Sequence, residues 1–95
     1  MTSLHFDTLE IDDHVLDKIE VRHGVAFAEV LEACSAEERH VRRSREGLYK
    51  VFSQSAAGCY LLVVLANHEG GIWKVATARE MTREECRLYQ RSRGE

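Results

Sequence analysis

Apolar residues recur at helical spacing in the first third of the chain. Between Ile11 and Val21, the residues Ile11, Val15, Leu16 and Ile19 fall on one helical face, and Asp12 and Asp13 stand where the helix dipole favours acidic side chains. Gly24 ends this predicted helix, because glycine is common just past a helix C-terminus. A second, shorter amphipathic helix is predicted from the apolar residues Val25, Phe27, Val30, Leu31 and Cys34. The pattern therefore predicts two short helices joined by a tight corner.

From residue 39 onward the pattern changes to that of β-strands. Residues 39–45 are polar and predict an edge strand that is protected by its charges. Residues 48–54 alternate between two faces, after a plausible turn at Glu46 and Gly47. Residues 59–66 are apolar on both faces, which is typical of a central strand, and residues 72–78 form the fourth predicted strand.

A capping box marks the start of a C-terminal helix at about Thr82, since Thr82 and Glu85 form the T-x-x-E motif. The predicted order is two helices, four strands and one helix. Short connections between the strands favour antiparallel pairing, and the two N-terminal helices supply apolar surface to cover one face of the sheet. We therefore predict an α+β fold with a four-stranded antiparallel sheet, formed by a single domain over residues 1–95.

The composition, 44% apolar and 31% charged, is that of a globular protein. The longest apolar run, residues 60–66, is far shorter than the roughly 20 residues that cross a bilayer. Residues 1–13 also lack the features of a signal peptide, so we expect a cytoplasmic protein that does not associate with a membrane. Because no common enzyme motif or metal-ligand spacing is present, we expect no metal or cofactor. Reduced thiols, mostly in the core, are predicted for Cys34, Cys59 and Cys86.

The net charge of −3 conceals a strong division along the chain. Residues 1–38 hold ten acidic and two basic residues, a net −8, whereas residues 39–95 hold eleven basic and six acidic residues, a net +5. A basic segment of this kind is typical of a region that meets a polyanion or an acidic partner. Basic and aromatic residues are therefore the first candidates for function.

The most regular basic pattern is a series of arginines at a spacing of four: Arg79, Arg83, Arg87 and Arg91. On a helix such a row could follow phosphate groups. A solvated helix face, with Glu80 and Glu84 as pairing partners, explains the last three equally simply, and we favour it for them. Arg79 differs, because the end of a strand can hold a side chain rigidly.

A second basic stretch covers residues 39–50. On a strand Arg43 and Arg45 point to one face and Arg42 to the other, so only part of the stretch can face one ligand. A charged edge strand and RNA binding are both consistent with this composition. Tyr49, next to Lys50, could stack on an unpaired base.

Histidines and the other aromatic residues give weaker signals. His23, in the corner between the two helices, fits either a proton-transfer group or, more commonly, a helix C-terminal cap. His40 and His68 show no metal-ligand pattern, and no role is assigned to them. Core positions are predicted for Tyr60, Trp73 and Tyr89.

Three segments, taken in their order and spacing, resemble the BrnT family of toxins, part of the wider RelE/ParE-like superfamily. They are RHGVAFAEV at 22–30, YLLVVLA at 60–66 and VATAREMTREECRLY at 75–89, and the resemblance extends over roughly residues 11–91. It implies a RelE/BrnT-like fold. It also implies a ribonuclease toxin of a type II toxin–antitoxin pair, which cleaves RNA without a metal and is neutralised by a cognate antitoxin.

In cleavage of this kind a 2′-hydroxyl attacks the neighbouring phosphate. The site must accept a proton, stabilise extra negative charge on the phosphate and protonate the departing 5′-oxygen. The resemblance assigns the phosphate to Arg79, because a guanidinium matches two phosphate oxygens and keeps its charge. His23 and Lys50 are the further catalytic candidates, and the candidates for RNA binding are Arg43, Arg45, Tyr49 and Arg83.

The sequence departs from the family pattern in two places. Arg22 replaces the lysine of the family's K-H-G element, and the opening HFDTLEIDD lacks the family's tryptophan. Together with the net negative charge, these departures support a second hypothesis, a catalytically inactive relative that acts as a protein- or nucleic-acid-binding module. An exposed edge strand at 39–45 would also allow a homodimer.

Overall fold

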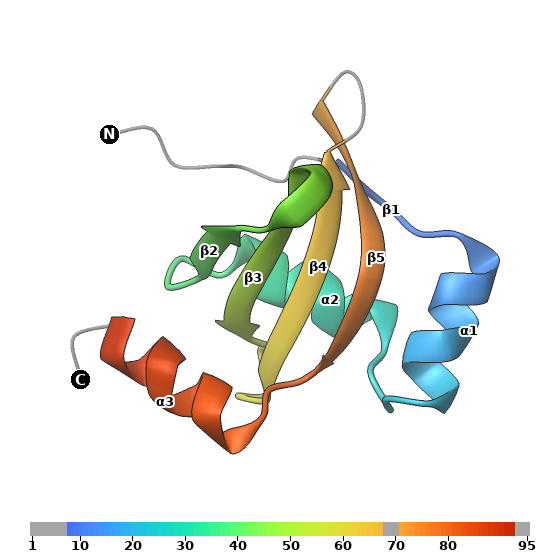
Figure 1. Cartoon of the computed structure of the whole chain (residues 1–95). Helices are drawn as coiled ribbons and strands as arrows, with labels where there is room; N and C mark the ends of the chain where they lie inside the picture. Colours follow the sequence, from blue (N-terminus) through green and yellow to red (C-terminus); the bar gives the residue numbers. More distant parts are fainter. Residues whose placement is uncertain (1–7, 68–70, 93–95) are drawn as a thin grey trace.

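The protein has an α+β fold in which helices lie on both sides of one sheet (Figure 1). The computed structural model describes residues 8–67 and 71–92. All the predicted helices and strands are present, with boundaries shifted by a few residues. In chain order the elements are β1 (Thr8–Glu10), α1 (Asp13–Val21), α2 (Phe27–Ser35), β2 (His40–Arg43), a 3₁₀ turn (Arg45–Gly47), β3 (Leu48–Gln54), β4 (Tyr60–Asn67), β5 (Ile72–Glu80) and α3 (Arg83–Ser92).

The sheet has five strands, in the order β1-β5-β4-β3-β2. β1 runs parallel to β5, and all other neighbours are antiparallel. The expectation of a four-stranded, purely antiparallel sheet was therefore wrong. A strand of three residues with one apolar side chain, Leu9, is too short to show alternation, which is why β1 escaped prediction. The predicted edge position of β2 and central position of β4 are confirmed.

Two local features fix how the helices enter and leave the sheet. Gly24 adopts a left-handed φ of 64°, and the Val25 N–H donates to the Ile19 carbonyl at 2.9 Å, which closes the corner between α1 and α2. At the start of α3 the Thr82 hydroxyl accepts the Glu85 N–H at 3.1 Å, while the Glu85 carboxylate accepts the Thr82 N–H at 2.8 Å. The predicted capping box is therefore confirmed.

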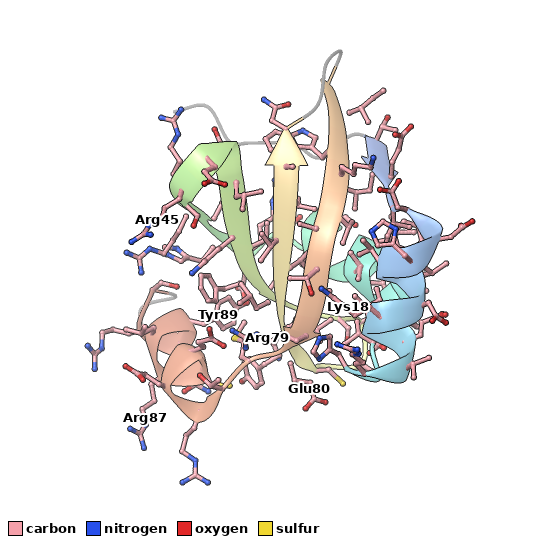
Figure 2. All side chains as sticks on the ribbon, turned by 45° about the vertical axis from the view of Figure 1, so that its right-hand side comes forward. Lys18, Arg45, Arg79, Glu80, Arg87 and Tyr89 are labelled. Atoms are coloured by element: carbon pink, nitrogen blue, oxygen red, sulfur yellow. The ribbon has the colours of Figure 1, made fainter. Side chains whose placement is uncertain are left out.

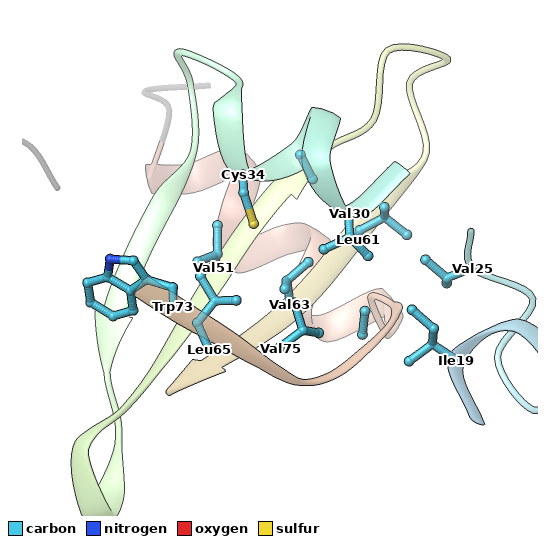
Figure 3. Packing of buried hydrophobic residues seen from close by; sticks show 12 residues of the cluster. Ile19, Val25, Val30, Cys34, Val51, Leu61, Val63, Leu65, Trp73 and Val75 are labelled. Atoms are coloured by element: carbon cyan, nitrogen blue, oxygen red, sulfur yellow. The ribbon is translucent and has the colours of Figure 1, made fainter. Parts of the chain in front are cut away.

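α1 and α2 cover one side of the sheet, which we call the α1/α2 face, and enclose the main core. In Figure 3, Val30 and Cys34 of α2 point toward the central strands, and Ile19 and Val25 close the core beside them. The predicted burial of Trp73 is confirmed. The buried residues of this core are Ile19, Val25, Val30, Ala33, Cys34, Val51, Leu61, Val63, Leu65, Trp73, Val75 and Ala78.

α3 covers part of the opposite side, the α3 face, through a smaller apolar cluster. Phe52, Leu62 and Tyr89 are buried there, and Tyr89 lies between α3 and the sheet, as predicted (Figure 2). The Tyr89 hydroxyl donates to the Glu38 carbonyl at 2.9 Å, and its ring meets Tyr60 edge to face at 5.9 Å. One aromatic side chain thus anchors α3 to the sheet and to the segment that leads into β2.

The cysteines occupy three different environments. Cys34 is buried in the main core, whereas Cys59 is exposed and Cys86 is partly exposed, so the prediction of mostly buried thiols was wrong. Burial raises the pKa of the Cys34 thiol to about 12, although the nearby positive charge of Arg39 acts in the opposite direction. Within residues 8–67 and 71–92, no helix is long and apolar enough to span a membrane.

Candidate functional site

The charge division of the sequence becomes a division in space. The acidic first part of the chain forms β1, α1 and α2, whereas the basic second part forms the other four strands and α3. α1 and α2 cover one face of the sheet, so much of the negative charge lies on that side. Basic residues collect on the α3 face and on α3 itself, among them Arg42, Lys50, Arg79, Arg83, Arg87 and Arg91.

Strand register determines which side chains are neighbours on the α3 face. Across β2, β3, β4 and β5, one row consists of His40, Phe52, Leu62 and Arg79. The next row consists of Arg42, Lys50, Val64 and Thr77. α3 covers the middle of the first row through Tyr89, whereas Arg42 and Lys50 remain exposed. Because these two are cross-strand partners, their positive charges lie side by side.

A cleft of about 240 Å³ opens where β2 and β3 meet the C-terminal half of α3, and we call it the α3 cleft. Its apolar wall comes from Phe52, Tyr89 and Leu88, of which Leu88 is 46% exposed. The full lining is His40, Arg42, Phe52, Leu88, Tyr89, Arg91 and Ser92. A second hollow of about 190 Å³, lined by Glu38, Arg39, His40 and Ser92, lies beside it. His40 therefore borders both hollows.

The α3 cleft combines positive charge with an apolar surface. Among the residues that the structure describes, no carboxylate lines the cleft, whereas Arg42 of β2 and Arg91 of α3 both do. The carboxyl end of α3 adds about half a negative charge there. The full positive charge of a single arginine outweighs it. The His40 imidazole supplies a group that can both donate and accept a hydrogen bond. This arrangement is suited to a ligand that joins an anionic group, which the arginines can bind, to a flat ring that can pack against the apolar wall.

Arg79, the first catalytic candidate, is held in an ion pair. Its guanidinium donates to both carboxylate oxygens of Glu85, at 2.8 and 2.9 Å, and to the Glu80 carbonyl at 3.1 Å. Hydrogen bonding to Glu85 raises the pKa of Arg79, and the same contact lowers the pKa of Glu85. Since Glu85 also caps α3, Arg79 fastens the start of this helix to the end of β5.

Three of the predicted RNA-binding residues lie away from the α3 cleft. The Arg43 guanidinium lies 6.0 Å from the centre of the Tyr49 ring, and Tyr49 meets Trp73 edge to face at 5.1 Å. This stack belongs to the α1/α2 face, so the prediction that Arg42 and Arg43 point to opposite faces is confirmed. Arg45 begins the 3₁₀ turn before β3 and is exposed.

The catalytic candidates Arg79, His23 and Lys50 do not form one cluster. Lys50 lies on the α3 face beside Arg42, two strands and two residues from Arg79, which places their Cα atoms roughly 12 Å apart. His23 is half-buried in the connection between α1 and α2, the helices that cover the opposite face. Arg83 is the first residue of α3 and is exposed. Only Lys50 among these residues adjoins the α3 cleft.

Sequence reasoning missed His40, Arg42 and Arg91 as a group. One signal was available, because His40 and Arg42 are two residues apart on a predicted edge strand and must share a face. The position of Arg91 depends on how α3 docks through Tyr89, and helix periodicity does not reveal that. His68 lies outside the described residues. Among residues 8–67 and 71–92, no group of three or more histidine, cysteine or acidic side chains is placed to hold a metal.

Comparison with known proteins identifies the fold. No family model matches the sequence, and no curated protein matches it either. In structure the protein is similar to the Brucella abortus ribonuclease toxin BrnT, with a TM-score of 0.67 over 80% of this chain and 97% of that chain. The chain has the BrnT fold. At 13% identity the likeness concerns the fold alone, and it confirms the fold that the sequence resemblance implied.

Proposed function

We propose that the protein is a ribonuclease toxin of a type II toxin–antitoxin pair. One observation carries the proposal: the BrnT fold, shared with a ribonuclease toxin over 97% of that toxin's length. The charge distribution supports it, because the α3 face presents Arg42 and Lys50 to solvent and α3 adds Arg91 beside them. A single-stranded RNA, with one negative charge per nucleotide, complements such a surface.

The proposed chemistry is metal-independent cleavage through the 2′-hydroxyl. The 2′-oxygen bonds to phosphorus, the bond to the 5′-oxygen breaks, and the products are a 2′,3′-cyclic phosphate and a free 5′-hydroxyl. The protein must take the proton of the 2′-hydroxyl, return one to the 5′-oxygen and stabilise the additional charge between these steps. Arg79 is proposed for the charge. His23 and Lys50 are proposed for proton transfer, which requires a rearrangement when RNA binds, because the three side chains do not form one cluster.

A cognate antitoxin is part of the same proposal, since a toxin that degrades the RNA of its own cell must be neutralised. The acidic helices α1 and α2 and the basic α3 face offer two chemically different surfaces for it. Pairing of the edge strand β2 with a second copy of the chain remains a further prediction.

A second candidate function is a binding module that keeps the fold without the reaction. The Arg79–Glu85 ion pair favours it, because a guanidinium bound to both oxygens of a carboxylate must leave that partner before it can bind a phosphate in the same way. In this case Arg79 acts only by fastening α3.

Induced expression in a bacterial host tests the two candidates. Growth and total RNA are followed for the wild type, Arg79→Ala and Glu85→Gln. Both variants break the charged pair, but only Arg79→Ala removes the guanidinium. Arrest with RNA loss in the wild type and Glu85→Gln, but not in Arg79→Ala, is the result expected for a chemical role of Arg79.

Equal loss of toxicity in both variants would instead assign Arg79 to the docking of α3. If the wild type is soluble and folded but leaves growth and RNA unchanged, the ribonuclease proposal is wrong and the binding module is favoured.

A further inference from the structure

We propose that the α3 cleft binds one nucleotide of a single-stranded RNA, with a phosphate between Arg42 and Arg91 and the base against Leu88 and Phe52. The choice of RNA as the ligand rests on the proposed function. The site itself rests on the cleft and its lining residues. It stands apart from Arg79, because His40 and Arg79 are three strands apart in the same row, roughly 14 Å between Cα atoms.

The size of the cleft limits what it holds. At about 240 Å³ it is smaller than the roughly 300–1,000 Å³ of pockets for drug-sized ligands. It is therefore suited to one nucleotide rather than to a large cofactor. The exposed side chain of Leu88, beside the nearly buried rings of Phe52 and Tyr89, forms an apolar surface against which a flat base can pack.

The charges of the cleft fit a phosphate that joins such a base to the next nucleotide. Arg42 and Arg91 come from different elements and border the same hollow, so one phosphate can accept hydrogen bonds from both guanidinium groups. Lys50, the cross-strand partner of Arg42, adds a third positive charge toward the open part of the face. Glu38 lines the neighbouring hollow together with Arg39.

An acidic peptide is the main rival ligand, because it would satisfy the same arginines. The geometry favours a nucleotide for one reason. The cleft is a single short hollow bounded by β2, β3 and the last turns of α3, whereas an extended peptide would add along the free edge of β2 and not enter the hollow.

The chain supplies matched controls for this site. Arg43 follows Arg42 on the same strand but faces the other side, where it lies over Tyr49. Arg87 precedes Arg91 by one helical turn and extends from α3 away from the sheet (Figure 2). Within each pair, Arg42 with Arg43 and Arg91 with Arg87, the two substitutions remove one positive charge from the same element. They differ in whether the arginine lines the α3 cleft.

Fluorescence anisotropy with a labelled uridine hexamer measures binding directly. The probe carries 2′-O-methyl groups, which remove the attacking hydroxyl and prevent cleavage. We expect the purified wild type to bind it, Arg42→Gln and Arg91→Gln to bind about tenfold more weakly, and Arg43→Gln and Arg87→Gln to stay within about twofold of the wild type. Each cleft variant should also reduce the slope of log K against log salt concentration by about 0.7, the loss of one phosphate contact.

Leu88→Ala tests the base separately from the phosphate. Leu88 is 46% exposed and lies outside both buried clusters, so we expect its truncation to leave the fold intact. Binding of the hexamer should weaken several-fold with an unchanged salt slope, because an apolar contact is lost and no charge is removed.

Three results would overturn the proposed nucleotide site: no hexamer binding by the wild type, equal effects of the cleft variants and their controls, or binding of an acidic peptide, weakened by Arg42→Gln and Arg91→Gln, by a protein that does not bind the hexamer. These outcomes are distinct from failure of the proposed function. RNA cleavage that is insensitive to Arg42→Gln and Arg91→Gln would leave the ribonuclease standing without this site. Hexamer binding in the cleft without any RNA cleavage would support the nucleotide site and contradict the ribonuclease proposal.

Discussion

The two faces of the sheet differ in how completely they are covered. The α1/α2 face is sealed by two helices over a continuous apolar core, whereas the α3 face is sealed only where Tyr89 docks and leaves Arg42 and Lys50 in solvent. The same strands therefore provide burial on one side and accessible positive charge on the other. From this contrast we expect folding stability to depend mainly on the α1/α2 face and the proposed RNA binding to depend on the α3 face.

The largest expected effect comes from truncating equivalent residues on the two faces of β4. Leu65 is 0% exposed in the main core, and Leu62 is 3% exposed in the smaller cluster under α3. Leu65→Ala should cost about 2–5 kcal/mol of unfolding free energy, and Leu62→Ala should fall at the lower end of that range. Urea denaturation measures both variants. Equal losses would show that the two faces contribute alike.

A smaller effect is expected at the anchor of α3. Tyr89→Phe keeps the ring but removes the hydroxyl that donates to the Glu38 carbonyl, so the unfolding free energy should fall by about 1 kcal/mol. Hydrogen exchange of the α3 amides should increase more than that of β4. An unchanged exchange pattern would mean that this hydrogen bond does not hold α3 in place.

The Arg79–Glu85 pair predicts a pH dependence. The pKa of Glu85 is lowered in the folded protein, so its contribution is complete above the unfolded pKa of about 4.3 and is lost as the pH falls through the lower folded value. Both side chains are partly exposed, which limits the effect to a few tenths of a kcal/mol. Glu85→Gln, which still caps α3, should show a smaller loss of stability on acidification than the wild type. Identical acid profiles would contradict this assignment.

The reactivity of the cysteine thiols tests how tightly the main core is closed, without any substitution. Cys34 is buried in the main core with its pKa raised to about 12, whereas Cys59 is exposed. Alkylation with iodoacetamide at mildly alkaline pH should therefore modify Cys59 first and Cys34 last, as followed by mass spectrometry. Early modification of Cys34 would show that the core opens readily.

Much of the fold could be predicted because it follows from local patterns. Helix spacing, strand alternation and the Thr82–Glu85 box are all local signals, and each predicted an element that is present. The parallel strand β1 could not be predicted, since its pairing with β5 joins segments more than 60 residues apart and only Leu9 marks it.

The candidate site was less predictable, because it depends on which side chains share a face after docking. Alternation correctly separated Arg42 from Arg43, but it did not show that Arg91 would meet Arg42 across a cleft. The partner of Arg79 was equally hidden. Glu85 was identified from its capping position, and its second role as an ion-pair partner of Arg79 appears only when α3 folds back beside β5.

The central claim is that RNA binds to the α3 face and is cleaved there. RNA cleavage by two matched double variants tests it. Arg42→Gln/Lys50→Gln removes two charges from that face, and Arg43→Gln/Arg45→Gln removes two charges from the neighbouring positions of the chain that lie away from the α3 cleft. Purified proteins are incubated with total RNA, and the products are followed over time. We predict cleavage by the wild type and by Arg43→Gln/Arg45→Gln, with strong loss in Arg42→Gln/Lys50→Gln. Full activity in Arg42→Gln/Lys50→Gln, with loss in the other variant, would contradict the account and place RNA on the α1/α2 face.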